Sequence, residues 1–360
     1  MYTDLFTSGK PMTDRRSMLL LIALSGLIIS LCMGLRQSLG LFMRPMGLEM
    51  GVTAAAFGFS IALQNIVWGV AQPFAGAIAD RRGPRPVLFA TALVFASGLL
   101  MMIYSNAFPG GLTLAGFLLG VGTTGFGTLY GAISRKVPPE KRSQTIGLVA
   151  AAGSLGTMVI APIGGRLIDG SGWKFAMLVF AGLAVCMAIA SLPIAEKPSA
   201  GNFQVKQKLS EALREAVGHR GYLFMTFAFF ACGFQLVFLT THLPAYLALC
   251  GVAPGVGATA LGLIGLFNAI GTYIFGQLGA RYSQKRLLAM IYLLRTLFIV
   301  AFLVAPISAA STLVFAAAMG FLWLGVTPSQ RKPIAEAKIS VEAALTGMMR
   351  NAAMNVVRSR

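Results

Sequence analysis

Long apolar runs recur along most of this chain, separated by short segments that carry charged residues, Pro or Gly. An α-helix needs about 20 apolar residues to cross the hydrocarbon core of a bilayer. The composition agrees, because 56% of the 360 residues are hydrophobic and only 11% are charged, with a mean hydropathy of +0.77. A water-soluble domain usually has about a quarter of its residues charged. The sequence therefore predicts an integral membrane protein.

The apolar runs predict helices, because backbone groups in lipid must be paired within the chain and the ten-residue alternation of a membrane barrel does not occur. The fold class is therefore expected to be all-α and transmembrane, with about ten spans of the length that a bilayer requires. Their expected limits are 18–40, 54–79, 86–105, 111–133, 144–166, 174–194, 221–248, 257–279, 287–305 and 309–327.

The distribution of Lys and Arg predicts the orientation. With the N-terminus in the cytoplasm, 24 of the 29 basic residues fall on the cytoplasmic side, three on the outer side and two inside spans. Cytoplasmic loops carry such an excess. We therefore expect a multi-pass protein of the cell (inner or plasma) membrane with a cytoplasmic N-terminus and the lipid bilayer as a partner. The basic residues form short clusters between spans, without aromatic platforms for bases, so no nucleic-acid binding is expected despite the net charge of +18.

The spans divide into two groups. We expect a six-helix bundle over 1–194, a polar cytoplasmic linker over 195–220, an incomplete bundle of about four helices over 221–327, and a polar cytoplasmic tail over 328–360. The linker either lies along the membrane surface as an amphipathic helix or is solvated; the sequence leaves both open. Because no apolar run follows Gly325, the chain is expected to be truncated after its tenth helix.

A short motif lies between the second and third spans. Its residues are Gly76, Asp80, Arg81, Gly83, Pro84 and Arg85. Gly76 is expected to let two helices approach closely, Asp80 to pair with Arg81 or cap a helix, and Gly83 with Pro84 to form a tight turn. A weaker copy follows in the second group of spans, with Ala280 in place of the aspartate. Two related halves are a common plan of secondary transporters.

This motif resembles the signature of the major facilitator superfamily in the same loop, and the resemblance extends over residues 18 to 325. It implies a fold of two helical bundles, and a conformational latch formed by Gly76, Asp80, Arg81, Gly83 and Arg85. Within the superfamily the chain resembles the monocarboxylate and oxalate–formate antiporter branch, in the stretches 34–40, 64–73 and 240–246. The branch implies a symporter or antiporter that carries small organic anions, monocarboxylates among them, by alternating access.

Arg36 is the first candidate for substrate binding. It lies inside the first span, where a cation that faces lipid costs several kcal/mol unless it is paired. The branch resemblance implies a cation in this helix that holds the substrate carboxylate, and a guanidinium suits that group. We therefore expect Arg36 to face a central cavity. The alternative is that Arg36 reaches the lipid headgroups at the outer end of the helix.

Four further residues are expected to bind substrate, each with a structural alternative. Arg295 is the other cation inside a span, and it could instead pair with a carbonyl or a tyrosine. His242 is the titratable group inside a span near neutral pH, so protons are a candidate coupling ion, although a lone histidine often only joins helices. All eleven acidic residues lie outside the expected spans. The remaining two candidates, Asn65 and Asn268, could equally hold helices together.

Other classes of function have less support. An enzyme is not expected, because no His/Glu/Asp cluster and no nucleophile elbow occurs in the spans. The four cysteines lie singly, so neither a metal site nor a cofactor is expected. The Gly120-x-Gly122-x-x-Gly125 run lacks the strand of a dinucleotide site and indicates helix packing. Two alternatives remain: a truncated inactive or regulatory membrane protein of the same lineage, and a facilitator of another small solute.

Overall fold

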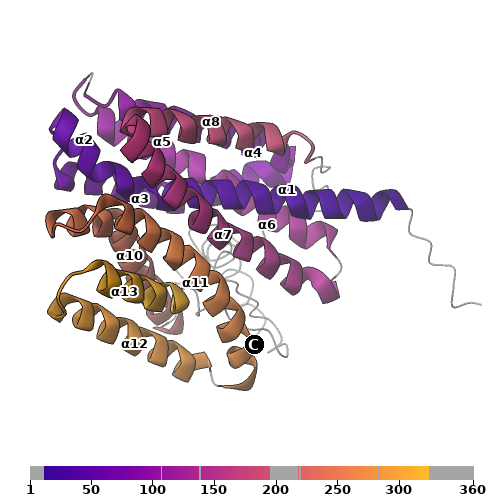
Figure 1. Ribbon diagram of the computed structural model, residues 1–360. Helices are drawn as coiled ribbons and strands as arrows, with labels where there is room; N and C mark the ends of the chain where they lie inside the picture. Colours follow the sequence, from indigo (N-terminus) through magenta and orange to yellow (C-terminus); the bar gives the residue numbers. More distant parts are fainter. Residues whose placement is uncertain are drawn as a thin grey trace, which may run out of the picture.

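The computed structural model describes residues 12–194 and 218–323, except for residues 107, 138, 219 and 283. Within these residues every regular element is a helix, which confirms the all-α fold (Figure 1). The predicted linker lies almost wholly outside the described residues, and the predicted tail lies wholly outside them. The helices are α1 (Met12–Gln37), η1 (Leu39–Phe42), α2 (Met43–Met50), α3 (Ala54–Arg82), α4 (Pro84–Ile103), α5 (Gly111–Thr123), α6 (Gly125–Lys136), α7 (Pro139–Ser171), α8 (Trp173–Ser191), α10 (Arg220–Leu249), α11 (Pro254–Arg281), α12 (Gln284–Val304) and α13 (Ala309–Phe321).

The helices match the expected spans closely. Among the described residues, nine helical stretches are long and apolar enough to cross a membrane. The tenth expected span, 309–327, appears as α13, which has 13 residues. At about 1.5 Å per residue, α13 is about 20 Å long and falls short of the roughly 30 Å hydrocarbon core. The two residues that follow it, Leu322 and Trp323, are 2% and 4% exposed, so its C-terminal end is buried.

The first span is longer than predicted. We expected it to end at residue 40, because Arg44 and Glu49 follow, but the chain continues through η1 and α2 to Met50. The negative charge of Glu49 is neutralised, because its Oε1 pairs with Lys174 Nζ at 2.5 Å. Its Oε2 accepts a hydrogen bond from the indole Nε1 of Trp173 at 2.6 Å. Both partners begin α8. The charge that suggested a loop is therefore neutralised by a helix that is remote in sequence.

The fourth span is interrupted where the sequence predicted continuity. Residues 111–133 were expected to form one helix, but α5 ends at Thr123 and α6 begins at Gly125. Three glycines near this break bring helices together: a Cβ at Gly120, Gly122 or Gly125 would lie within 3 Å of α3 or α4. The expected packing role of this glycine run is confirmed.

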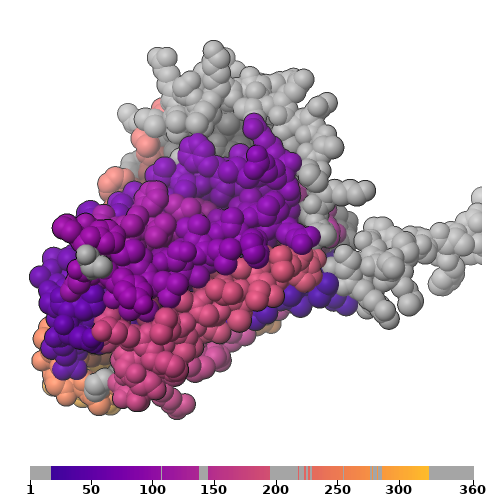
Figure 2. Space-filling view, turned by 90° about the horizontal axis from the view of Figure 1, so that it is seen from above, coloured from indigo at the N-terminus to yellow at the C-terminus, as the bar shows by residue number. Residues whose placement is uncertain are grey.

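The helices form two groups (Figure 1), which we call the first half (residues 12–194) and the second half (residues 218–323). Helices α7 and α11 lie side by side where the halves meet. A Cβ on Gly265 of α11 would be 2.6 Å from the carbonyl oxygen of Ser154, and Asn268 Nδ2 donates to Ser154 Oγ at 2.8 Å. Among the described residues, the first half forms most of the face seen in Figure 2.

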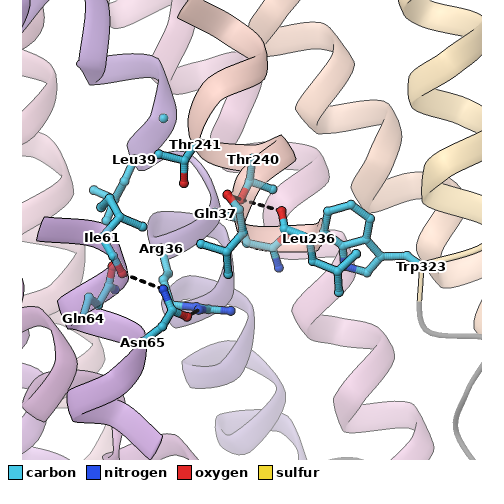
Figure 3. Close-up of a pocket in the computed structure, with 12 residues that line it drawn as sticks. Arg36, Gln37, Leu39, Ile61, Gln64, Asn65, Leu236, Thr240, Thr241 and Trp323 are labelled. Carbon is cyan, nitrogen blue, oxygen red and sulfur yellow. Dashed lines mark hydrogen bonds between the residues drawn. The ribbon is translucent and has the colours of Figure 1, made fainter. Parts of the chain in front are cut away.

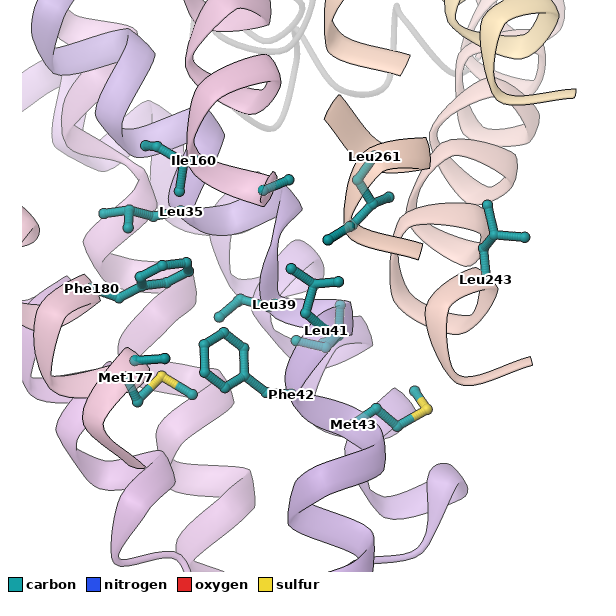
Figure 4. Close-up of a cluster of buried hydrophobic side chains, with 14 of the residues drawn as sticks. Leu35, Leu39, Leu41, Phe42, Met43, Ile160, Met177, Phe180, Leu243 and Leu261 are labelled. Carbon is teal, nitrogen blue, oxygen red and sulfur yellow. The ribbon is translucent and has the colours of Figure 1, made fainter. Parts of the chain in front are cut away.

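The halves share a hydrophobic core at one end of the molecule. This cluster combines Phe42 and Phe180 of the first half with Leu243 and Leu261 of the second (Figure 4). Three further clusters belong to single halves: two lie in the first half, the larger of which contains Phe126, and one lies among α11, α12 and the end of α13. The shared core lies at the end of the molecule that the charge distribution predicts to face outward.

Large apolar side chains are also exposed along the outside of the helices. They include Phe74 on α3, Ile189 on α8 and Leu293 on α12, with exposed fractions of 63%, 58% and 71%. Soluble proteins rarely expose contiguous apolar surface of this kind. A lipid environment accounts for it, in agreement with a multi-pass membrane protein.

Candidate functional site

A small pocket lies between the halves, next to the shared core (Figure 3). The end of α1, the following η1 and one face of α3 form its first-half wall, and α10 and Trp323 form its second-half wall. About 50 Å³ is accessible to the centre of a water-sized sphere. One water needs about 10–15 Å³ by this measure. The pocket therefore has room for a few waters or a small polar group.

Arg36 contributes the positive charge of this pocket. Its Nη1 donates to Asn65 Oδ1 at 2.9 Å, and Asn65 Nδ2 donates to the carbonyl oxygen of Ile61 at 2.7 Å. The guanidinium carbon lies 4.7 Å from the ring centre of Trp68. A cation over an indole face is attracted by the ring quadrupole. Asn65 and Trp68 thus hold the guanidinium at the pocket rather than at the lipid headgroups.

The Trp68 side chain is itself fixed. Its Nε1 donates to Gln72 Oε1 at 2.8 Å, and Gln72 Nε2 donates to the carbonyl oxygen of Thr124 at 3.1 Å, at the break between α5 and α6. Trp68 and Gln72 were not among the site residues expected from the sequence. Their spacing could have identified them, because Asn65, Trp68 and Gln72 follow one another at three and four residues and share a helix face.

Gln64 adds an unsatisfied polar group to the pocket wall. The residue is 1% exposed, and neither Oε1 nor Nε2 of its side chain has a hydrogen-bond partner among the described residues. Leaving a buried donor or acceptor unpaired costs about 1–3 kcal/mol. Water or a ligand that pairs with this amide is therefore favoured. The hydroxyl of Thr240, by contrast, already donates to the carbonyl oxygen of Leu236 at 3.1 Å.

Two expected site residues lie elsewhere and do not line this pocket. His242 packs against Phe238, with 4.9 Å between the ring centres, and a Cβ on Gly58 of α3 would lie 3.3 Å from its Cε1. Asn268 bonds Ser154 at the contact between α7 and α11. Asn268 thus joins two helices, the structural alternative that the sequence left open for it, whereas His242 packs next to Gly58 of α3.

Arg295 is not among the residues that line this pocket either, and its donors are engaged. Its exposed fraction is 0%. Nε donates to the carbonyl oxygen of Leu322 at 3.0 Å, Nη2 donates to the carbonyl oxygens of Leu322 and Trp323, and Nη1 contacts Cys232 Sγ at 3.1 Å. The guanidinium lies 5.7 Å from the ring centre of Tyr292. These contacts correspond to the pairing with a carbonyl that the sequence left open.

The expected latch residues gather at the other end of α3. Asp80 pairs with Arg135 in the last turn of α6, with 3.2 Å between Oδ1 and Nη1, a partner that the sequence did not indicate. Gly83 joins α3 to α4 with φ +85°, a conformation that favours glycine. A Cβ at Gly76 would meet no atom of the described residues within 4 Å, so the close helix approach expected there is not seen among them. Arg81 and Arg85 are exposed.

The described carboxylates stand at helix ends. Asp14 and Glu140 lie in first turns, and Glu49, Asp80 and Asp169 lie in last turns. The described residues contain no group of three or more His, Cys, Asp or Glu that could hold a metal ion. Arg36 therefore faces a pocket whose other described lining groups are neutral.

Comparisons with known proteins agree with this architecture. The family model of the Major Facilitator Superfamily matches residues 12–351. The oxalate:formate antiporter of Oxalobacter formigenes is 23% identical over 284 residues, which are 75% of this chain and 65% of the relative. Multidrug resistance protein MdtH of Klebsiella pneumoniae (strain 342) is 26% identical over 266 residues, 74% of this chain and 64% of the relative.

The chain thus spans just under two thirds of the length of these two curated relatives. Among solved structures, a crystal structure of a mutant of the nucleoside transporter NupG resembles this protein with a TM-score of 0.68. That match is 15% identical in sequence and covers 95% of this chain and 89% of the other. At this identity, the match supports the fold alone.

Proposed function

Because the chain belongs to the major facilitator superfamily, we propose that it is a secondary transporter of small organic anions and that Arg36 binds their carboxylate. The observation that carries this proposal is the Arg36 guanidinium in a pocket between the halves, held by Asn65 and Trp68. A guanidinium pairs with a carboxylate through two parallel hydrogen bonds.

The surroundings of Arg36 favour an anion over a neutral solute. The described residues that line the pocket include Arg36 and no acidic side chain, which supports an anionic ligand. Holding a cation inside a span is costly, and an anionic ligand offsets part of that cost. Gln64 offers a further donor that has no partner within the described residues. A carboxylate can use donors of both side chains.

The relatives differ in what their names state. The oxalate:formate antiporter is named for two carboxylates, whereas MdtH is named for multidrug resistance. The choice of an organic anion therefore rests on Arg36, and the oxalate:formate relative supports it. Transport would proceed by rocking of the two halves about the pocket. A core shared by the halves at one end and separate cores at the other suit such a motion.

The test compares acetate with acetamide, its neutral isostere, for binding to the purified full chain and for counterflow in liposomes. We expect acetate to bind and acetamide not to compete. Arg36→Gln should abolish acetate binding, and Arg36→Lys should weaken it about tenfold, because an ammonium keeps the charge but loses the planar fork. Arg166→Gln, at an exposed arginine on α7, is the matched control.

If acetamide competes as well as acetate, the substrate is not recognised by its charge. The facilitator of another small solute is then the better interpretation. Equal acetate binding by the Arg36→Gln variant and the unmodified protein would reject Arg36 as the anion site.

We also propose that the N-terminus and the Asp80–Arg135 pair face the cytoplasm, on the basis of the charge distribution. Cys250, which is exposed at the end of α10, would then face outward. A membrane-impermeant thiol reagent applied to intact cells should label Cys250, while a cysteine introduced at Gly83 should react only after permeabilisation. The reverse pattern would invert the orientation.

A further inference from the structure

The C-terminal end of α13 presents an energetic problem that Arg295 addresses. The last carbonyls of a helix have no partner within the helix, and α13 ends inside the molecule rather than at its surface. Unpaired carbonyls are expensive in an apolar environment. The C-terminal end of a helix also carries partial negative charge, which a cation stabilises. Arg295 donates to the carbonyl oxygens of both Leu322 and Trp323, directly after α13.

These contacts connect α12 to the wall of the pocket. Trp323 is 4% exposed and lines the pocket that contains Arg36. In Figure 3 its indole enters from the side opposite Asn65, next to Leu236. The backbone of Trp323 is bonded by Arg295, so the position of the indole depends on a side chain that does not itself line the pocket.

We propose that Arg295 is a positioning residue for this pocket: it fixes the Trp323 indole as a wall and so limits the size of the anion that can bind at Arg36. The effect on anions rests on the proposed function, but the position of Trp323 does not. Trp323 is the bulkiest side chain among the residues that line the pocket, so moving its indole would enlarge the space next to Arg36.

The contacts of Arg295 also identify suitable variants. Arg295→Gln retains at most one short donor group and loses the cation. Arg295→Lys keeps the cation near the helix end and can donate to one carbonyl at a time. Arg286→Gln removes the same charge from an exposed position at the start of the same helix, and serves as the matched control. Cys232→Ala removes only the sulfur contact and leaves both carbonyl bonds.

The first measurement follows Trp323 without any substrate. The chain has three tryptophans, so each variant is compared with the same variant carrying Trp323→Phe, and the difference isolates the Trp323 emission. In Arg295→Gln we expect this emission to shift to longer wavelength and its quenching by acrylamide to increase severalfold. Arg295→Lys, which can donate to one carbonyl at a time, should show a smaller shift in the same direction. Cys232→Ala should stay close to the unmodified protein, and Arg286→Gln should match it.

The second measurement compares the binding of acetate and phenylacetate. We expect Arg295→Gln and Trp323→Ala to shift the affinity ratio toward phenylacetate by about tenfold, the scale typical of a misplaced pocket group, with little change in maximal counterflow rate. Arg295→Lys should restore most of the original ratio. A merely destabilised protein would lose binding of both anions together.

The proposal is overturned if Trp323 emission is unchanged in folded Arg295→Gln, or if it changes while the affinity ratio does not. Should Arg295→Gln fail to fold, the same two criteria apply to Arg295→Lys, whose ratio must then lie between those of the unmodified protein and Trp323→Ala. If the unmodified protein binds neither anion, the proposed function fails, while the emission still tests the position of Trp323.

Discussion

Two arginines, Arg36 and Arg295, lie inside the spans expected from the sequence, and their surroundings are opposite. Arg36 is half-buried beside a pocket, where one amide oxygen and one indole face hold its guanidinium. Arg295 is fully buried, and backbone carbonyls and a thiol receive its hydrogen bonds. The protein therefore uses the same cation once at a pocket and once inside its core.

The difference shows what decides the role of an intramembrane cation. Helix ends that lie inside the protein supply carbonyls, and a guanidinium that pairs with them has few donors left for a ligand. Arg36 is on α1 one residue before that helix ends, and its side chain meets the side chains of α3. The position of an arginine within its span therefore indicates its role less well than the helix ends that lie next to it.

The largest effect is expected in stability. Arg295→Gln should lower the free energy of unfolding by about 3 kcal/mol, because two buried carbonyls lose their donors. Arg286→Gln should change it by less than about 0.5 kcal/mol, as most surface substitutions do. Thermal unfolding in detergent measures both. If Arg36→Gln destabilises the protein as much as Arg295→Gln, the two arginines do not differ in their contribution to stability, and the distinction between a pocket arginine and a core arginine is rejected.

The next effect tests whether Arg36 is available to an anion. Asn65→Asp should place a carboxylate about 3 Å from the guanidinium and weaken acetate binding about 100-fold, since an internal carboxylate competes at high effective concentration. Asn106→Asp, at an exposed asparagine near α5, introduces the same group elsewhere and should leave binding unchanged. Equilibrium binding of labelled acetate measures both variants. Tight binding by Asn65→Asp would place the anion away from Arg36.

A smaller effect is expected from the indole beneath Arg36. Trp68→Leu should weaken acetate binding about fivefold, because a cation over an aromatic face is worth about 1 kcal/mol. Trp68→Phe should keep most of this attraction while losing the hydrogen bond to Gln72. The same binding assay ranks the two variants. An equal loss in both would mean that the bond to Gln72, rather than the ring face, holds Arg36 in place.

The smallest effect concerns an arginine near the surface. The Asp80 and Arg135 side chains are 21% and 31% exposed, and partly exposed pairs contribute about 0–1 kcal/mol. Asp80→Asn should therefore lower the unfolding free energy by less than about 1 kcal/mol, and the loss should shrink at high salt. Chemical denaturation at two salt concentrations checks this. A loss as large as that of Arg295→Gln would show that the exposure of an arginine does not determine how much its contacts contribute to the unfolding free energy.

Much of the fold could be predicted because its signals are local. A span is recognised from the hydropathy of its own residues, so most expected limits lie close to the helix ends. The first span differs, since η1 and α2 continue beyond Gly40, and so does the tenth, since α13 ends at Phe321. The break at Thr124 could not be predicted in this way, since α5 and α6 are both apolar. The carbonyl oxygen of Thr124 accepts its hydrogen bond from Gln72, which lies on another helix.

The sequence by itself determined that this chain is a helical membrane protein with two cations inside its spans, because the cost of charge in lipid is set by composition and depth alone. Only the tertiary structure decided which cation meets a pocket. That choice depends on how each helix is rotated and on which neighbour presents free donors or acceptors. Asp80 meets Arg135 across 55 residues, and Arg295 meets Leu322 across 27. Such pairings arise from packing, and no local pattern encodes them.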